Sequence, residues 1–342
     1  MHDTTRSSCR GSFEELRRSG AVYVDKTDLI FELLYYASKG FQLARPDGFG
    51  KSLLLDTIKT FFTKGLEPFA GLKLEKLMAG RSAKRYPVML IDFACFAKAE
   101  SGAEFEQALS SCLRTQLQKL QLRDQEGRLV EIDDEFYGAD TPPDSADLAQ
   151  DIFSAVPECS LVLLIDNLSA PLEASRGIPE LQKAIFCTIS QFLCMMRVCH
   201  PHFRFILVTG NNIYEKYLLE YAAAQHKFFI RDDTDCLLQI SQEKCWQSVL
   251  GFTLSEVQEY FSAELELSAR ALECSKEEVM TQLMRCCPRY EFAENNLHKD
   301  LSAQHVFSPE DILRFFADPR ACLKQTGQSV LPVKKVQYYR YY

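Results

Sequence analysis

The sequence lacks long apolar runs and has no excess of positive charge. No stretch approaches the roughly 18 uninterrupted apolar residues that a membrane-spanning helix needs, so we expect no membrane partner. Residues 1–20 show no apolar stretch after their basic residues, so we expect no secretory signal and a cytoplasmic location. Lys and Arg total 39 against 47 Asp and Glu, a formal net charge of −8, which argues against nucleic acid as a partner.

A regular spacing of metal ligands is also missing, although the chain contains 13 cysteines. The densest group of cysteines and histidines comprises Cys187, Cys194, Cys199, His200 and His202. These spacings do not match the paired CxxC pattern of a zinc site. Because no export signal is expected, free thiols in a reducing compartment are the predicted state, and we predict no metal cluster at these residues.

What remains is an ordinary globular composition, with 46% hydrophobic and 25% charged residues, sufficient for one large domain or two. Continuous runs of bulky apolar residues occur at 41–46, 87–94, 160–168 and 203–210, with a weaker fifth run at 236–241. Such runs are typical of strands that helices cover on both faces. Helical patterns lie between them at 103–121, 146–156 and 179–199. Residues 1–250 are therefore predicted to form an α/β domain with a doubly wound parallel sheet of about five strands.

From residue 251 onward, helical signals replace the strand pattern. Thr253 and Glu256 have the spacing of a capping box, in which each residue accepts a backbone N–H of the other. Ser308 followed by Pro309 marks a second helix start. We therefore predict a second unit over residues 251–342, a small helical module packed on the sheet domain.

Residues 45–52, RPDGFGKS, lie between a predicted strand and an amphipathic helix. A phosphate-binding loop needs glycines that let backbone N–H groups turn inward, a lysine for the β- and γ-phosphates and a hydroxyl for Mg²⁺. Gly50, Lys51 and Ser52 match the second half of GxxxxGK[ST], whereas Arg45 replaces its first glycine. We predict a P-loop NTPase-like fold that binds ATP at this loop. The predicted nucleotide-binding residues are Arg45, Pro46, Asp47, Gly48, Phe49, Gly50, Lys51, Ser52 and Leu53.

An acidic residue at the end of a neighbouring strand must complete the Mg²⁺ site. Asp166 ends one apolar run and is predicted to bind Mg²⁺ together with Ser52, while Asp92, at another strand end, is the competing candidate. Asp166 and Asn167 are the predicted catalytic residues, and Asn167 stands where hydrolytic P-loop proteins carry a glutamate. An amide orients water but cannot accept its proton, so we expect the chemical step to be slower by about 10²–10⁴-fold.

Together these motifs resemble the predicted AAA-ATPase-like proteins, a family often fused to a PD-(D/E)xK nuclease domain. The most specific matches are residues 23–27, similar to the family's YVDKT signature, and residues 45–53, similar to RPRRFGKSL. Further matches lie at 13–16, 86–93, 164–166, 209–210, 250–257 and 306–309. The resemblance implies a P-loop fold with ATP as ligand, Mg²⁺ as cofactor and a helical lid over the site.

The sequence departs from the family pattern at the site itself. Asp47 and Gly48 stand where the family carries two arginines, and Asn167 replaces the family's catalytic acid. A unit charge about 8 Å from a phosphate is worth about 2 kcal/mol at an effective dielectric of about 20, so nucleotide binding should be weakened. The C-terminal region contains no PD…(D/E)xK pattern, so we do not expect the nuclease domain.

Three functions fit these residues. The favoured one is a degenerate P-loop protein that binds Mg-ATP with weak or no hydrolysis and serves as a switch or scaffold. The first alternative is an active AAA-type ATPase in which Asn167 or Asn211 positions the attacking water. The second is a protein-interaction module whose nucleotide site is dead. In each case the protein partner is unknown and could be a second copy of the chain.

Overall fold

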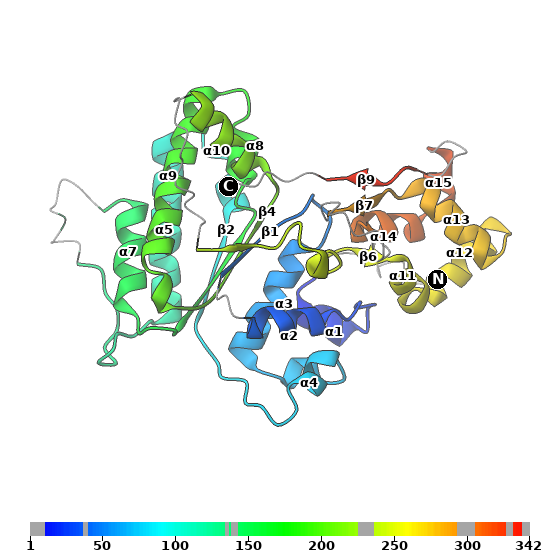
Figure 1. Cartoon of the computed structure of the whole chain (residues 1–342), viewed down its shortest axis with the longest axis horizontal. Coiled ribbons are helices and arrows are strands. Elements are labelled where there is room, and N and C mark those ends of the chain that lie inside the picture. The colour runs from blue at the N-terminus through cyan, green and yellow to red at the C-terminus, as the bar shows by residue number, and fades with distance from the viewer. Residues whose placement is uncertain are drawn as a thin grey trace.

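A five-stranded sheet forms the centre of the larger part of the molecule (Figure 1). The computed structural model describes residues 11–36, 40–133, 137, 143–224, 236–292, 305–325 and 331–336. The strands are β1 (Gly40–Ala44), β2 (Val88–Asp92), β3 (Leu161–Asp166), β4 (Phe203–Gly210) and β5 (Leu238–Gln239). They are all parallel, in the order β2-β3-β4-β1-β5. The parallel sheet predicted from the apolar runs is therefore confirmed: β4 spans its predicted run, and the other four strands end two residues before theirs.

Helices cover both faces of this sheet, which explains why its strands are continuously apolar. The first face packs on α1 (Phe13–Ser19), α2 (Thr27–Tyr35), α3 (Lys51–Lys64) and α4 (Lys73–Leu77). The second packs on α5 (Gly102–Leu120), α7 (Ser145–Ala155), α8 (Ala170–Ala174), α9 (Pro179–Val198) and α10 (Ile213–Ala224). Within β3, Val162 and Leu164 belong to the first core, whereas Leu163 and Ile165 belong to the second. Short 3-10 turns occupy Glu67–Phe69, Phe93–Phe96, His200–His202 and Lys244–Trp246.

The described helices after residue 253 form a unit with a hydrophobic core of its own (Figure 1). Its helices are α11 (Leu254–Tyr260), α12 (Ser262–Leu272), α13 (Lys276–Cys286), α14 (Pro309–Ala317) and α15 (Pro319–Lys324). Both expected helix starts are present, because Thr253 and Glu256 form a complete capping box and Ser308 is the N-cap of α14. We call this unit the C-terminal module.

The C-terminal module also contains a small sheet that the sequence pattern did not predict. Its strands are β6 (Phe252–Thr253), β7 (Arg289–Glu291), β8 (Val306–Phe307) and β9 (Lys334–Lys335), in the order β6-β8-β7-β9. Strands of two or three residues are too short to show an alternation of apolar and polar residues. The module is therefore helical with a small mixed sheet at its junction with the larger sheet domain.

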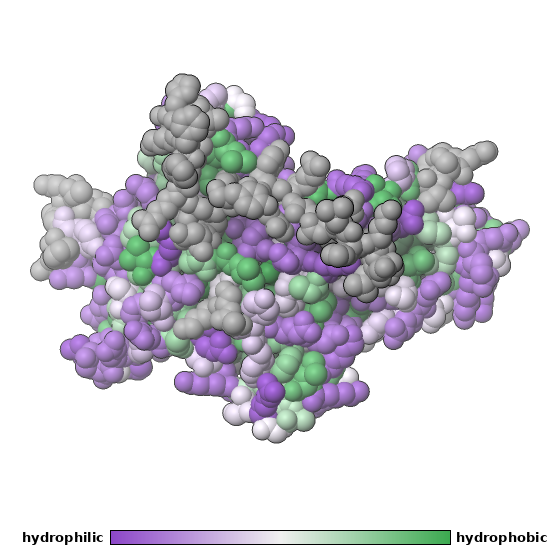
Figure 2. Space-filling model, viewed as in Figure 1, coloured by the Kyte–Doolittle hydropathy of each residue, from purple (hydrophilic) through white to green (hydrophobic). Residues whose placement is uncertain are grey.

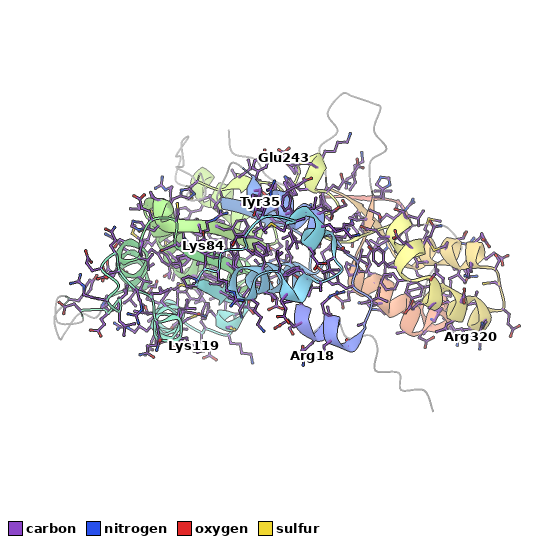
Figure 3. All side chains as sticks on the ribbon, turned by 90° about the horizontal axis from the view of Figure 1, so that it is seen from below. Arg18, Tyr35, Lys84, Lys119, Glu243 and Arg320 are labelled. Atoms are coloured by element: carbon purple, nitrogen blue, oxygen red, sulfur yellow. The ribbon has the colours of Figure 1, made fainter. Side chains whose placement is uncertain are left out.

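The coloured part of the face in Figure 2 is mostly hydrophilic, with apolar residues in small separate groups. Seen from below, the labelled Arg18, Lys119 and Arg320 are exposed on three separate helices (Figure 3). Across the described ranges, no helix is both long and apolar enough to cross a bilayer. In the same ranges, no three His, Cys, Asp or Glu side chains gather in a way that could hold a metal ion.

Side chains buried in the central strands should contribute more to the stability of the protein than exposed side chains do. Leu163, fully buried in β3, can be compared with Leu267, a leucine of α12 that is 64% exposed. Leu163→Ala should lower the free energy of unfolding by about 2–5 kcal/mol, because it removes buried methyl groups and leaves a cavity. Leu267→Ala should change it by no more than about 0.5 kcal/mol. Urea unfolding followed by circular dichroism measures both, and equal losses would contradict the assignment of β3 to the core.

Candidate functional site

The predicted phosphate loop is a tight bend between β1 and α3. Gly48 and Gly50 have φ angles of 79° and 88°, a left-handed conformation that glycine adopts without strain. Lys51 is the first residue of α3 and is 5% exposed. Its Nζ donates hydrogen bonds to the carbonyl oxygens of Arg45, at 2.9 Å, and Pro46, at 3.1 Å. The ammonium group therefore lies inside the bend, where a phosphate-binding loop places it.

An acidic side chain of the loop also binds this ammonium. Nζ of Lys51 donates to Oδ1 of Asp47 at 3.0 Å, and the Asp47 side chain is 81% exposed. The carboxylate thus neutralises the one lysine of the loop from its solvent side. A phosphate that enters the loop must compete with Asp47 for the Lys51 ammonium.

Asp166 joins the loop helix to the ends of two strands. It is 4% exposed and accepts three hydrogen bonds. Ser52 Oγ donates to Oδ2 at 2.5 Å, Thr209 Oγ1 donates to Oδ1 at 2.6 Å, and the Asn167 backbone N–H donates to Oδ1 at 2.9 Å. Thr209 was not predicted as a site residue, although its position near the end of a strand was the available signal.

The pair of Ser52 and Asp166 has the chemistry of a magnesium site. A hydroxyl and a carboxylate are both hard oxygen ligands, which Mg²⁺ prefers. Ser52 is exposed, and its Oγ lies 2.5 Å from Asp166 Oδ2, so both oxygens face one place beside the loop. The residues present therefore fit the cofactor that the sequence predicted.

The two asparagines expected to position water both have protein partners. Asn167 has a φ of 52°, a left-handed conformation that asparagine tolerates, and its Nδ2 donates to Asp92 Oδ1 at 3.0 Å. Asn211 Nδ2 donates to Glu173 Oε2 at 3.2 Å, while its Oδ1 accepts the backbone N–H of Ile213 at the start of α10. Asn167 thus lies beside a second carboxylate of the sheet edge, whereas Asn211 caps a helix.

Two predicted nucleotide-binding side chains are instead part of the interior. Arg45 is fully buried, and its guanidinium donates to the carbonyl oxygens of Ala44 and Ser241, both at 2.8 Å. The same group lies 4.0 Å from the centre of the Phe292 ring. Phe49 is 1% exposed and makes an edge-on contact with Phe292 at 5.3 Å. Both side chains support the loop from behind, so only their backbone groups are available to a phosphate.

The C-terminal module touches the loop directly at Gly48. The Gly48 carbonyl oxygen accepts hydrogen bonds from Ser308 Oγ at 3.1 Å and from the Glu310 backbone N–H at 3.3 Å. A Cβ atom added at Gly48 would lie 2.6 Å from Glu310 Oε2, closer than atoms can approach. Glycine is therefore favoured here both by its φ angle and by the nearness of α14.

The signature at residues 23–27 connects separate parts of the fold. Lys26 Nζ donates to both carboxylate oxygens of Glu256, at 2.7 and 2.9 Å, and to the Ser248 carbonyl oxygen at 2.7 Å. Burial lowers the pKa of Lys26, and the Glu256 carboxylate opposes that shift. Asp25 accepts the backbone N–H groups of Thr27 and Lys73, the first residues of α2 and α4, whose N-cap residues are Lys26 and Leu72. These residues anchor α4 and the C-terminal module.

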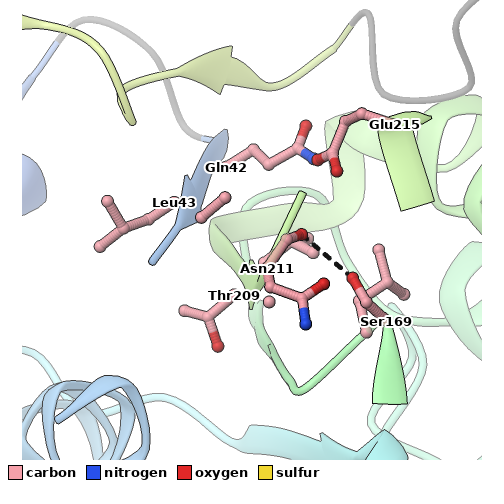
Figure 4. A pocket seen from close by; sticks show the side chains of 10 residues that line it. Gln42, Leu43, Ser169, Thr209, Asn211 and Glu215 are labelled. Carbon is pink, nitrogen blue, oxygen red and sulfur yellow. Dashed lines mark hydrogen bonds between the residues drawn. The ribbon is translucent and has the colours of Figure 1, made fainter. Parts of the chain in front are cut away.

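A small cavity lies beside the site, between β1, β4 and α10 (Figure 4). Its volume is about 10 Å³, which leaves room for about one water molecule. Gln42 and Glu215, hydrogen-bonded to each other, line one side. On the other side Ser169 Oγ donates to the Asn211 carbonyl oxygen at 3.1 Å (Figure 4). A nucleotide cannot enter this cavity.

A parallel sheet with a glycine-lysine-serine loop after β1 and an aspartate at the end of β3 defines a P-loop NTPase-like protein. A family model described as Predicted AAA-ATPase matches residues 10–216. That span is more than half of the chain, so the chain belongs to this family, which suggests a nucleotide-binding P-loop protein.

A curated relative is described as an uncharacterized protein in the vnfD 5′ region of Azotobacter chroococcum mcd 1. It is 26% identical to this chain over 252 residues. The alignment covers 71% of this chain and 42% of the relative, so the chain spans less than half of the relative's length. No solved structure matches the chain.

The contact between the loop and α14 can be tested by two glycine substitutions. Gly48 and Gly71 have φ angles of 79° and 80°, but a Cβ meets other atoms only at Gly48. Gly71→Ala should destabilise the protein by about 1–2 kcal/mol through backbone strain alone. Gly48→Ala should lose more in urea unfolding, because it must also displace Glu310. Adding Glu310→Ala to Gly48→Ala should recover that excess, and a Gly48→Ala loss no larger than that of Gly71→Ala would contradict the contact.

The Lys26 anchor can be tested against an exposed ion pair of the same kind. The Lys26 side chain is 11% exposed, whereas that of Lys73, paired with Asp28, is 48% exposed. Lys26→Met should lower the free energy of unfolding by about 1–3 kcal/mol, because two partners lose a donor in a buried site. Lys73→Met should lower it by about 0–1 kcal/mol. Thermal and urea unfolding report both values, and an unchanged Lys26→Met protein would rule out the anchor.

Proposed function

We propose that this chain binds a nucleoside triphosphate together with Mg²⁺, with ATP as the first candidate, at the loop of residues 45–53. The proposed protein hydrolyses the nucleotide weakly or not at all and acts as a switch or scaffold. The observation that carries this proposal is the Lys51 ammonium, held inside a left-handed glycine bend by the loop's own carbonyl oxygens. That arrangement leaves the loop's backbone N–H groups for an anion, which would then draw the Lys51 ammonium away from Asp47.

The neighbouring residues support Mg-ATP rather than a simple anion. Ser52 Oγ and Asp166 Oδ2 would hold the cation, because they are adjacent oxygen ligands beside the loop. Bound Mg²⁺ would neutralise part of the charge on the β- and γ-phosphates. Lys51 would bind the same phosphates after its ammonium leaves the Asp47 carboxylate. Thr209 would keep Asp166 in place through its hydrogen bond to Oδ1.

Weak affinity and weak turnover follow from two side chains of the site. Asp47 competes for the Lys51 ammonium, so binding of a nucleotide has to break an existing ion pair. Asn167 occupies the position at which hydrolytic members of the class carry a base, and an amide cannot accept the proton of water. Both features favour a protein that is regulated by nucleotide over a fast ATPase.

A switch is favoured because the C-terminal module is bonded to the loop itself. Ser308 and Glu310 donate to the Gly48 carbonyl oxygen, and Phe49 packs against the Tyr290 and Phe292 rings. A loop that rearranges around a phosphate would alter these contacts and shift the module. A protein partner, or a second copy of the chain, would then recognise the altered module.

Calorimetric titration with Mg-ATP tests the proposal directly. The wild-type protein should give saturable heat, and Lys51→Ala should weaken binding by about tenfold or more, because the charge-assisted bonds to phosphate are lost. Lys59→Ala, in the same helix but away from the loop, is the matched control and should bind as the wild type does.

Phosphate release from the same samples separates the alternatives. Saturable binding with slow or negligible release supports the proposed function. Rapid release that Lys51→Ala abolishes would instead identify an active ATPase. Absence of heat with every nucleotide would refute the proposal and favour the protein-interaction module.

A further inference from the structure

The sheet places a second carboxylate directly beside Asp166. Asp92 and Asp166 are the last residues of β2 and β3, and they are register partners in this parallel pair. Neighbouring strands lie about 4.8 Å apart, so the backbones of the two aspartates are separated by about that distance. Both therefore lie at the carboxyl edge of the sheet, where ligands of open α/β sheets bind.

The two carboxylates also share the face of the sheet on which the loop helix packs. Successive side chains of a strand point to opposite faces. Ile91 and Ile165 belong to the core under α5 and α9, whereas Leu90 and Leu164 pack in the core that includes α3. Asp92 and Asp166 come one position later and so return to the α3 side, which the bond between Ser52 and Asp166 demonstrates for Asp166.

Asn167 links Asp92 to the site. Its Nδ2 donates to Asp92 Oδ1 at 3.0 Å, and the backbone N–H of Ala94 donates to the same oxygen at 3.0 Å. In the part of the chain that the structure describes, Asp92 Oδ2 accepts no hydrogen bond, and the residue is only half-buried. Asp92 is therefore fixed in orientation by one oxygen while the other is available to a water molecule.

From this geometry we propose that Asp92 is the general base for hydrolysis at this site and that Asn167 is its positioning residue. This inference rests on the proposed function. The oxygen of a water molecule bonds to the γ-phosphorus, and one proton of that water passes to the Asp92 carboxylate. The bond between the γ-phosphorus and the bridging oxygen breaks, and its electron pair leaves with ADP. The products are ADP and inorganic phosphate, after which Asp92 returns its proton to solvent.

This arrangement also accounts for a low rate. The base is moved from the residue after Asp166 to the neighbouring strand, and its side chain is one methylene shorter than that of the usual glutamate. Asn167 compensates in part, because its amide holds the carboxylate toward β3. The missing glutamate thus slows the chemistry without removing every group that can accept a proton.

Asp92→Asn is the decisive variant, because asparagine keeps the shape and the Oδ1 acceptor but not the basicity. Phosphate release at saturating Mg-ATP should fall by about 10²–10⁴-fold, while the calorimetric affinity for Mg-ATP should stay within about twofold.

Two further variants sharpen the test. Asn167→Ala keeps Asp92 but removes its amide partner, so it should lower the rate by less than Asp92→Asn does, while the calorimetric affinity for Mg-ATP stays within about twofold. Asp318→Asn is the matched control, since Asp318 also accepts a backbone N–H at a helix start, in α15 of the C-terminal module. Its phosphate release should equal that of the wild type.

Several outcomes would overturn the assignment. A wild type that binds Mg-ATP but releases no phosphate above the Lys51→Ala background would refute a base at Asp92 and leave the proposed function intact. The base assignment would also be refuted if Asp92→Asn released phosphate as fast as the wild type. It would likewise be refuted if a loss of Mg-ATP affinity explained the lower rate of this variant. A protein that does not bind Mg-ATP would refute both proposals together.

Discussion

The buried carboxylate of Asp166 is the constraint on which the site depends. A carboxylate with 4% exposure is costly to bury unless its oxygens accept hydrogen bonds. Here Ser52 supplies one from α3, Thr209 supplies one from β4, and the Asn167 backbone supplies a third. These bonds fix the first turn of α3 against the ends of two strands. The position of the loop relative to the sheet edge follows from this junction.

The loop is held from its other side by the C-terminal module. Ser308 and Glu310 bind the Gly48 carbonyl oxygen, while Lys26 binds Glu256 at the start of α11. Lys51 lies inside the bend and is neutralised by Asp47. The one lysine of the loop is therefore already paired, and the loop backbone is already bonded to the module. Under the proposed function, anion binding at this loop would therefore change the contacts that hold the module.

Much of the sheet domain could be predicted from local patterns. The apolar runs at 87–94, 160–168 and 203–210 each became a strand, because a strand covered on both faces needs apolar residues at every position. The loop at 45–52 was recognisable because glycine, lysine and serine must follow one another at a helix start. Even the fifth, weaker run formed a two-residue strand beside β1.

The sequence alone thus determined the parallel sheet, the loop between β1 and α3, and the capping box at Thr253. The tertiary structure alone decided that Arg45 and Phe49 pack inward, that Thr209 bonds to Asp166 and that Asp92 lies beside Asn167. It also decided the small sheet of the C-terminal module. The reason is physical: strand and helix signals arise from neighbouring residues, whereas these contacts join segments that only the strand order and the packing of the module bring together.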